Sequence, residues 1–243
     1  MPKLGIITQA RMTSTRLPGK ILLKANNKTI LEHHVGRLKW SRTPIFVATT
    51  VNKSDEPVVD LCKSLGFSYF RGDEHNVLER FYQCAEQNKL DIIVRVTSDC
   101  PLIDGAIVRK GIEQYITLNN SNLYYSNCLT RTYPRGLDFE IFSFDLLKEA
   151  YLNATLNSDK EHVTPYINQN RSGRVIIANH VEEKDFSNLR WTLDTMEDWT
   201  LIKALIEKYK AETLSYEELL GVIVDNPNLT TLNNNIKQKE IQL

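Results

Sequence analysis

LGIITQARMTSTRLPGK, residues 4–20, combines a short apolar run with a basic loop. Residues 4–8 are apolar or β-branched over the length of a strand, which predicts a β-strand. The loop that follows carries three basic residues among small and hydroxyl residues: Arg11, Arg16 and Lys20. Open α/β sheets place anionic ligands at the carboxyl ends of their parallel strands. Because guanidinium and backbone N–H groups donate charge-assisted hydrogen bonds to phosphate oxygens, the stretch predicts a phosphate-binding loop.

Positive charge is concentrated at the beginning of the chain. Six basic residues precede Glu32, the first acidic residue: Lys3, Arg11, Arg16, Lys20, Lys24 and Lys28. The whole chain has a formal net charge of +0, so the remainder carries an equal excess of acidic residues. This balance argues against nucleic-acid or membrane-surface binding, and it makes the cationic loop a local feature.

Length and composition indicate an ordinary globular protein. The 243 residues can form one α/β domain or two small ones with a substantial core. No apolar run reaches the roughly 18 residues of a membrane-spanning helix, and no secretory signal precedes the first strand. The five histidines lack zinc-like spacing, and the four cysteines lie far apart without C-x-x-C spacing. We therefore expect a cytoplasmic protein with reduced thiols and no membrane insertion.

Apolar periodicity divides the chain into alternating strands and helices. Strands are predicted at residues 4–8, 45–50, 67–70, 91–97, 122–126, 137–142, 174–179 and 189–193. Helices are predicted from the Thr29-x-x-Glu32 capping box to about 40, at 54–65, around 77–85, at 104–116, 143–154 and 160–168, and from about 197 and 215. This alternation predicts an α/β fold with a mainly parallel, Rossmann-like sheet. We expect one domain over 1–225, a projecting acceptor or dimerisation subregion at about 128–190, and a loosely held polar tail at 226–243.

The basic loop does not match the common phosphate-binding motifs. A Walker loop requires glycine where Ser14 stands and serine or threonine where Ile21 stands, and no G-x-G-x-x-G is present. Residues 9–20 (QARMTSTRLPGK) instead resemble the signature loop of sugar cytidylyltransferases. The loop is similar to those of the CMP-deoxy-manno-octulosonate and acylneuraminate enzymes and most similar to that of the spore-coat polysaccharide cytidylyltransferase-like family. From the residues alone, a basic surface turn is the alternative.

The resemblance implies a nucleotide-diphospho-sugar transferase (GT-A-like) fold in which this loop wraps the triphosphate of CTP. It implies nucleotide contacts from Gln9, Ala10, Arg11, Ser14, Thr15, Arg16 and Lys20. Base contacts are expected after the second and third strands, from Thr49, Arg71 and Gly72. The octulosonate enzymes' segment in this region is replaced here by residues 70–80, FRGDEHNVLER. Arg80 is therefore either a base contact or an ordinary solvated helix charge.

Two aspartates follow predicted strands and are candidate Mg²⁺ ligands. Asp99 stands in RVTSDCPLID (95–104), and Asp194 in LRWTLDT (189–195). Magnesium is typically bound by one or two carboxylates together with phosphate oxygens. Both aspartates match, position by position, the magnesium ligands of the resembled synthetases. A turn or cap carboxylate is the alternative for Asp99, and a helix N-cap for Asp194.

The chemistry implied is in-line attack of an acceptor oxygen on the α-phosphorus of CTP, with pyrophosphate leaving. Catalysis then depends on positioning and electrostatic stabilisation. We expect Arg11 and Lys20 to bind the β- and γ-phosphates, and Mg²⁺ on Asp99 and Asp194 to lower the pKa of the acceptor hydroxyl. These four residues are the predicted catalytic set, and no histidine base is expected.

The acceptor site is expected over residues 131–162, where segments 131–140 and 158–166 resemble the spore-coat family. Its candidate contacts are Arg131, Tyr133, Arg135, Asp138, Glu140 and His162. The two arginines would pair with a sugar carboxylate and the two acidic residues with sugar hydroxyls. His162 is equally a structural histidine. Because the related synthetases are commonly dimers, a homodimer is expected.

The predicted function is CMP transfer from CTP to an acidic sugar for surface polysaccharide synthesis. One alternative is a GT-A-type glycosyltransferase, which would ordinarily carry an Asp-x-Asp motif where Thr97-Ser98-Asp99 stands. The other is a catalytically silent nucleotide-binding protein. The intact basic loop and both aspartates favour the cytidylyltransferase.

Overall fold

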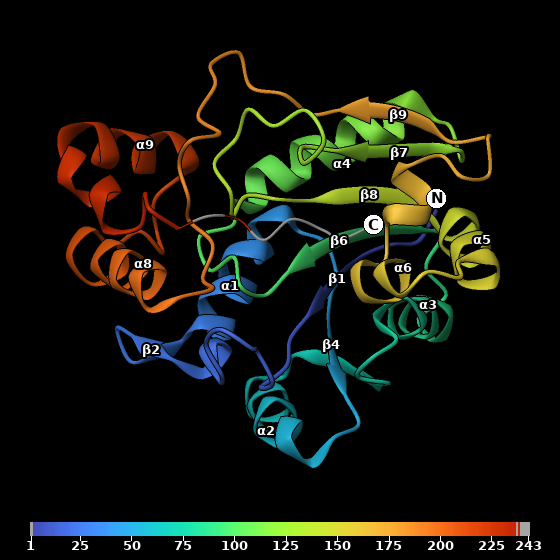
Figure 1. Cartoon of the computed structure of the whole chain (residues 1–243), viewed down its shortest axis with the longest axis horizontal. Coiled ribbons are helices and arrows are strands. Elements are labelled where there is room, and N and C mark those ends of the chain that lie inside the picture. The colour runs from blue at the N-terminus through green and yellow to red at the C-terminus, as the bar shows by residue number, and fades with distance from the viewer. Residues whose placement is uncertain (1, 237, 239–243) are drawn as a thin grey trace.

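Seven strands form the central sheet of the computed structural model, which describes residues 2–236 and 238 (Figure 1). The sheet order is β5-β4-β1-β6-β8-β7-β9, and β2 and β3 form a separate hairpin. The strands are β1 (Leu4–Gln9), β2 (Lys24–Ala25), β3 (Lys28–Thr29), β4 (Ile45–Thr50), β5 (Ser68–Gly72), β6 (Ile92–Thr97), β7 (Leu123–Ser126), β8 (Glu140–Ser143) and β9 (Ile176–Asn179). Only β8 runs antiparallel to its neighbours β6 and β7. The predicted α/β class with a mainly parallel sheet is confirmed.

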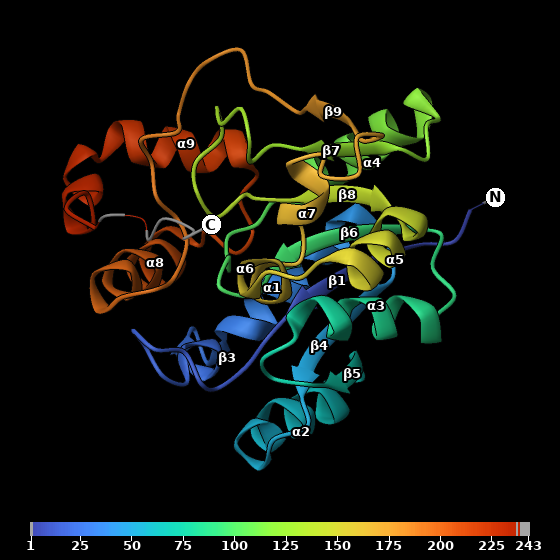
Figure 2. The same cartoon turned by 45° about the vertical axis from the view of Figure 1, so that its right-hand side comes forward.

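Helices cover both faces of this sheet (Figure 2). They are α1 (Ile30–Leu38), α2 (Glu56–Leu65), α3 (Val77–Gln87), α4 (Gly105–Leu118), α5 (Phe144–Asn153), α6 (Asn157–His162), α7 (Pro165–Asn168), α8 (Met196–Tyr209) and α9 (Tyr216–Asp225), with short 3₁₀ turns η1 (Lys20–Leu22), η2 (Lys39–Ser41), η3 (Lys53–Asp55) and η4 (Pro227–Leu232). Successive strand residues point to opposite faces. Ile6 therefore packs with α1, α4, α8 and α9, whereas Ile7 packs with α3, α5 and α7.

The strand register determines where the site forms. Gln9, the last residue of β1, lies opposite Ala48 of β4 on one side and Thr97 of β6 on the other. The loops after β1 and β6 therefore leave the sheet side by side at its carboxyl edge. Ligands of open α/β sheets bind at this edge.

Three predicted elements differ from the structure. The strand expected at 137–142 begins only at Glu140, and the stretch 189–193 forms one isolated bridge, Arg135–Arg190, instead of a strand. The helix expected at 160–168 is divided into α6 and α7, because Val163 has a left-handed backbone with φ 71°. The local apolar pattern does not show where loop contacts replace strand pairing or where a turn interrupts a helix.

The segment 128–190 was expected to project, but two of its strands belong to the sheet. Strand β8 lies between β6 and β7, β9 forms an edge strand, and helices α5, α6 and α7 lie between β8 and β9 in the chain. The loops before β8 and after β9 extend beyond the strands and lie side by side (Figure 1). The amide N–H of Phe186 donates to the Thr132 carbonyl over 2.7 Å, which joins the two loops.

Residues 226–236 also differ from the loosely held tail that was expected. They contain η4, and Leu229 and Asn233 are buried. An apolar residue and a buried amide hold the segment against α8. The remainder of the predicted tail, residues 237 and 239–243, lies outside the described residues.

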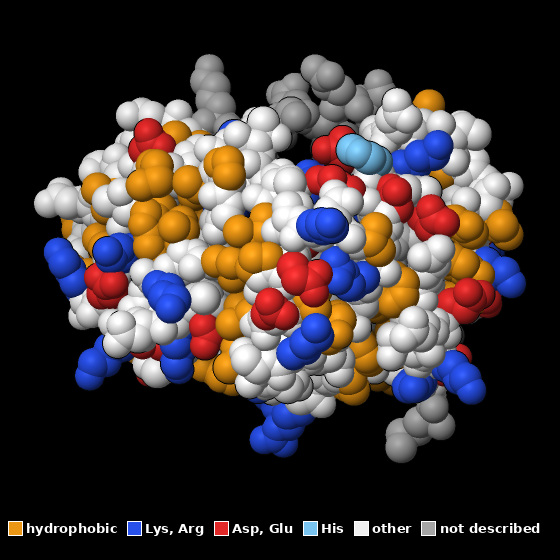
Figure 3. Space-filling model, turned by 90° about the horizontal axis from the view of Figure 1, so that it is seen from below, with side chains coloured by type: hydrophobic (Ala, Val, Ile, Leu, Met, Phe, Trp, Pro, Cys, Tyr) orange, Lys and Arg blue, Asp and Glu red, His pale blue; other side chains and the backbone are white. Residues whose placement is uncertain are grey.

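Across residues 2–236 and 238, no helix is both long and apolar enough to cross a membrane. On the molecular face in Figure 3, basic and acidic side chains are interspersed among apolar ones. That face presents mixed charge.

Candidate active site

The loop after β1 is held in shape by its own backbone and by acidic side chains. Gly19, in the left-handed region at φ 70°, donates its N–H to the Met12 carbonyl over 2.9 Å and closes the loop. The Met12 N–H donates to Asp55 Oδ1 over 2.6 Å, and the Thr13 hydroxyl donates to Glu74 over 2.5 Å. The loop therefore has a defined conformation that holds its cations at the carboxyl edge of the sheet.

Lys20 is the point at which three distant segments meet. Its ammonium donates to Asp99 Oδ2 over 2.9 Å and to Asp194 Oδ1 over 2.8 Å. A third bond reaches the Leu193 carbonyl over 2.7 Å. Burial acts to lower the pKa of Lys20, but the two carboxylates raise it above its ordinary value. The predicted meeting of the basic loop with both aspartates is therefore observed.

Asp99 follows β6 and is tied to the segment that carries Asp194. Its carbonyl accepts from the Leu193 N–H over 2.7 Å and from the Thr192 hydroxyl over 3.2 Å. Burial alone would raise the pKa of the Asp99 carboxyl, but the Lys20 charge and a hydrogen bond from Thr97 hold it at about 2. Asp99 is therefore an anion at neutral pH.

A buried chain of hydrogen bonds lies behind Asp99. The Nδ1–H of His34 donates to the Cys100 carbonyl over 2.8 Å, so Nε2 of the neutral ring accepts from Thr8 over 2.9 Å. The Thr8 oxygen then accepts from the Ser98 hydroxyl over 2.8 Å. Burial lowers the pKa of His34 to about 4 and keeps the ring neutral. This chain fixes the backbone on both sides of Asp99.

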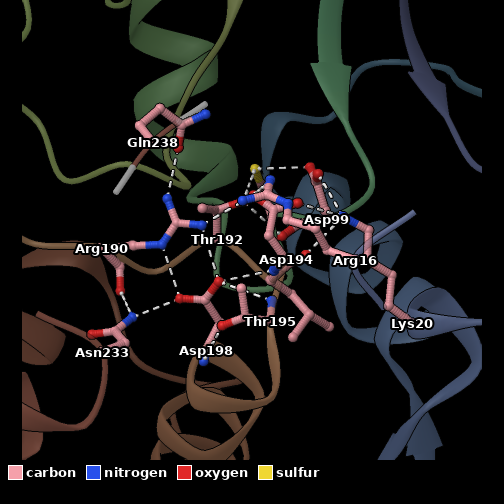
Figure 4. A network of polar contacts seen from close by, with 12 residues as sticks. Arg16, Lys20, Asp99, Arg190, Thr192, Asp194, Thr195, Asp198, Asn233 and Gln238 are labelled. Atoms are coloured by element: carbon pink, nitrogen blue, oxygen red, sulfur yellow. Dashed lines mark hydrogen bonds and ion pairs between the residues drawn. The ribbon is translucent and has the colours of Figure 1, made fainter. Parts of the chain in front are cut away.

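Asp194 contacts cations with both carboxylate oxygens (Figure 4). Oδ1 accepts from Lys20, whereas Oδ2 accepts from Arg16 over 2.8 Å and from Arg190 over 3.0 Å. Asp194 is not the helix cap that was its alternative interpretation. Thr195 caps α8 in a capping box with Asp198.

The two carboxylates fit a hard divalent cation that is also bound by phosphate oxygens. Among the described residues no group of three or more His, Cys, Asp or Glu is placed to bind a metal by itself. Asp99 and Asp194 each have an oxygen within hydrogen-bond distance of the same Lys20 nitrogen. Two carboxylates converging on one point are the protein donors that Mg²⁺ uses when a nucleotide supplies further ligands.

A cleft of about 460 Å³ opens over this cluster. Its walls include these predicted nucleotide contacts: Gln9, Ala10, Arg11, Ser14, Thr15, Arg16, Lys20 and Arg80. Both predicted metal ligands, Asp99 and Asp194, also line it. Arg80, which the sequence left undecided, is buried and contributes to the wall, and burial lowers its pKa to about 10. His162 lines the same cleft.

Three predicted base contacts do not line the cleft. Thr49 is fully buried within β4. Arg71 pairs with Glu56 over 2.8 Å and donates to main-chain carbonyls. A Cβ at Gly72 would stand 3.0 Å from Cγ of Arg80, so glycine here leaves room for that arginine.

A second cavity, of about 490 Å³, adjoins the cleft and shares Thr97 and His162 with it. The predicted acceptor contacts in its wall are Arg131, Arg135, Asp138, Glu140 and His162. Tyr133 is not part of this wall, because it is buried and stacks on His180 with ring centroids 5.5 Å apart.

Most charged groups in the second cavity are paired. Arg131 forms a bidentate pair with Asp138, with N–O distances of 2.5 and 2.9 Å. Glu140 is paired with Arg95 and accepts from Tyr124 and Thr164, each over 2.6 Å. Within residues 2–236 and 238, Arg135 has no carboxylate at ion-pair distance. Burial and the adjacent Arg131 charge lower its pKa.

Sequence reasoning did not assign a role to Arg190, Asp198 or Asn233, which contact one another beside Asp194 (Figure 4). The Thr195-x-x-Asp198 spacing was a capping-box signal for Asp198. Arg190 and Asn233 had no local signal, because their partners are distant in the chain or lie in irregular structure.

The chain is similar to known proteins over most of its length. The family model described as cytidylyltransferase matches residues 5–240. The spore coat polysaccharide biosynthesis protein SpsF of Bacillus subtilis is 32% identical over 234 residues, which cover 93% of this chain and 95% of that protein. A solved cytidylyltransferase from Leptospira borgpetersenii superposes with a TM-score of 0.90 at 35% identity, covering 99% of this chain and 100% of that one.

A more distant structure supports the fold alone. CMP:2-keto-3-deoxy-manno-octonic acid synthetase, solved in complex with CTP, has a TM-score of 0.58 at 18% identity and covers 84% of this chain and 98% of its own. The expected nucleotide-diphospho-sugar transferase fold is thereby confirmed. On the family match over residues 5–240, this chain belongs to the cytidylyltransferase family.

Proposed function

We propose that this protein transfers CMP from CTP to an acidic sugar, of the nonulosonic or octulosonic acid type, and releases pyrophosphate. The relatives support this choice, because one is named for spore coat polysaccharide biosynthesis and the fold neighbour for CMP:2-keto-3-deoxy-manno-octonic acid synthesis. The product would serve surface polysaccharide or glycan assembly. A homodimer remains a prediction.

The observation that carries the proposal is the convergence of Lys20, Asp99 and Asp194 in the wall of one cleft. A nucleotidyltransferase must hold a polyanion beside anionic ligands for a divalent cation. Cations from one loop and carboxylates from two distant segments satisfy both requirements within a single cavity.

Arg11, Arg16 and Lys20 would bind the triphosphate. Arg11 and Arg16 are partly exposed and each has one ion pair among the described residues, to Glu74 at 3.6 Å and to Asp194 at 2.8 Å. Both therefore retain N–H groups that can donate to phosphate oxygens. Arg80 lines the same cleft and is the remaining base-contact candidate.

In the reaction, the acceptor hydroxyl attacks the α-phosphorus and its proton leaves to solvent, while the bond to the bridging oxygen breaks and pyrophosphate departs. Mg²⁺ held by Asp99 and Asp194 would supply charge neutralisation at the α-phosphate. Lys20 and Arg16 would stabilise the charge that develops on the leaving oxygens. The protein's contribution is positioning and electrostatics.

Arg135 is the best-placed partner for an acceptor carboxylate. It lines the adjoining cavity, and within the described part of the chain it has no carboxylate partner. Its lowered pKa reflects burial beside another cation, so an incoming carboxylate would relieve an unfavourable charge. Arg131, by contrast, is already held in a bidentate ion pair by both oxygens of Asp138.

Incubation with CTP, UTP, GTP or ATP, Mg²⁺ and a panel of acidic and neutral sugars tests the proposal, with pyrophosphate as the readout. We expect release that requires CTP and one acidic sugar. Asp99→Asn and Asp194→Asn should each lower kcat by about 10²-fold or more. Near-normal rates in both variants would remove the metal assignment, and no release with any pair would favour a silent nucleotide-binding protein.

A further inference from the structure

Arg190 uses its whole guanidinium group within a buried network beside the cleft (Figure 4). Nε donates to Asp198 Oδ1 over 2.9 Å, and one terminal nitrogen donates to Asp198 Oδ2 over 3.0 Å. The same terminal nitrogen reaches Asp194 Oδ2 over 3.0 Å, and the other donates to Gln238 over 2.7 Å. A guanidinium held by a bidentate pair has a fixed orientation. Arg190 is therefore a rigid donor to Asp194.

The other partners of Asp194 belong to the cleft, whereas Arg190 does not. Lys20 and Arg16 line the cavity, and bound phosphates would compete for their N–H groups. Arg190 does not line that cavity, although it donates to the same Asp194 carboxylate. It is the cationic partner of Asp194 that a nucleotide in the cleft would leave in place.

Asp198 connects this contact to the backbone. It is fully buried and accepts from the Asp194 N–H over 2.9 Å and from the Thr195 N–H over 3.2 Å. Burial acts to raise the pKa of Asp198, but hydrogen bonds from Arg190 and Asn233 lower it, so the carboxylate stays charged. One side chain thus holds both the main chain of Asp194 and the guanidinium that contacts its carboxylate.

The C-terminal segment completes the network. The Asn233 amide donates to the Arg190 carbonyl over 3.0 Å and to Asp198 Oδ1 over 2.9 Å. Asn233 is buried, although its surroundings in the sequence are rich in Asn and polar. Asn233, although distant in sequence, therefore holds in place the two residues that contact Asp194, Arg190 and Asp198.

We propose that Arg190 is a positioning residue that fixes the side-chain orientation of Asp194, and that Asn233 holds Arg190 for this task. The inference rests on the proposed function, since it concerns the carboxylate that would meet the nucleotide-bound cation. It gives the C-terminal segment a role in the active site. Partners behind a metal ligand commonly change metal affinity about 10- to 100-fold when removed.

Calorimetric titration of CTP without acceptor, across a series of Mg²⁺ concentrations, tests this without turnover. For Arg190→Met we expect the Mg²⁺ concentration that gives half-maximal CTP affinity to rise by about tenfold or more. CTP affinity in chelator should stay within about twofold, because the phosphate-binding loop is untouched. Asn233→Ala should raise the Mg²⁺ requirement by about fivefold, as expected for hydrogen bonds to charged groups.

Arg190→Lys separates positioning from charge. Lysine keeps the cation but cannot bridge Asp194 and Asp198 with a planar fork, so it should behave like Arg190→Met. Arg174→Met is the control, because it removes an arginine–carboxylate pair with Glu149, and neither residue lines the cleft. It should leave the Mg²⁺ dependence unchanged.

The outcomes discriminate between the two levels of inference. If the wild-type protein binds no CTP at any Mg²⁺ concentration, the proposed function is wrong. If it binds CTP and Arg190→Met shows the same Mg²⁺ dependence, or if Arg190→Lys restores it fully, the positioning role is wrong. If Arg190→Met does not fold by circular dichroism, Asn233→Ala and Arg190→Lys decide by the same criterion.

Discussion

The cleft over Lys20 and the second cavity, which we propose bind nucleotide and acceptor, share Thr97 and His162 but hold their arginines differently. In the cleft, Arg11 and Arg16 have side chains that are each 37% exposed. In the cavity, Arg131 is bound by both oxygens of Asp138. An exposed arginine can bind an incoming anion, whereas an arginine that is mostly buried and held by both oxygens of one carboxylate forms part of the wall. We infer that exposure and existing ion pairs, more than residue type, distinguish ligand contacts from structural ones.

Among the predicted effects, replacement of Lys20 by methionine in the cleft should lower activity the most. It removes the cation shared by Asp99 and Asp194 and leaves Asp99 without its ion-pair partner. We expect kcat/KM for pyrophosphate release to fall by about 10³-fold, in the range seen when one preorganised charge-stabilising donor is lost. Steady-state kinetics below the melting temperature of the variant measure it.

Lys28→Met is the control for Lys20, because Lys28 is an exposed basic residue of the same segment on β3. Its kinetics should match the wild type. A Lys20→Met enzyme within tenfold of wild type would show that the shared cation does not assemble the cleft.

Acid should destabilise the folded protein through His34, which is buried, neutral and hydrogen-bonded to the Cys100 carbonyl next to Asp99. The folded-state pKa of about 4 lies below the ordinary 6.5, so the unfolded chain binds the proton more readily. Stability from this group is complete above about pH 6.5 and is lost as the pH falls toward 4, by up to about 3 kcal/mol. Urea unfolding between these pH values should show that loss.

The variant His34→Asn isolates this contribution. It has no titrating ring, so its stability should fall less steeply with acid than that of the wild type. Parallel curves for the two proteins would mean that His34 is not the group that senses acid here.

The sequence predicted those elements that interactions between near neighbours in the chain determine. Strand β4 and the capping box at Thr29 and Glu32 were predicted as observed, because apolar run and cap chemistry act over a few residues. Asp99 and Asp194 were predicted through the resemblance of their motifs. Asp99 meets Lys20 because β1 and β6 are adjacent parallel strands whose carboxyl ends share one edge. Asp194 does not directly follow a strand, and its segment is joined to Asp99 by the hydrogen bond from the Leu193 N–H to the Asp99 carbonyl.

The remainder depended on side-chain pairing between segments that are irregular or distant. Arg131 and Tyr133 look like ligand contacts in sequence, yet one is held in a bidentate pair by Asp138 and the other is buried and stacks on His180. Arg190 looks like an ordinary surface arginine, yet it is buried beside Asp194. No periodicity or spacing reports which donors remain free after folding.

The smallest predicted effect compares the two arginines of the second cavity, Arg131 and Arg135. Arg135→Ala should raise KM for the acidic sugar by about tenfold, the loss of one charge-assisted contact, while KM for CTP stays within about twofold. Arg131→Met should instead lower stability, by about 2 kcal/mol, because it leaves Asp138 half-buried without its partner. Kinetics with each substrate varied in turn, together with urea unfolding, separate the two arginines. If Arg131→Met raised the sugar KM and Arg135→Ala did not, the Arg131–Asp138 pair would be opening to bind substrate, and the ion pairs of the free protein would not identify the ligand contact.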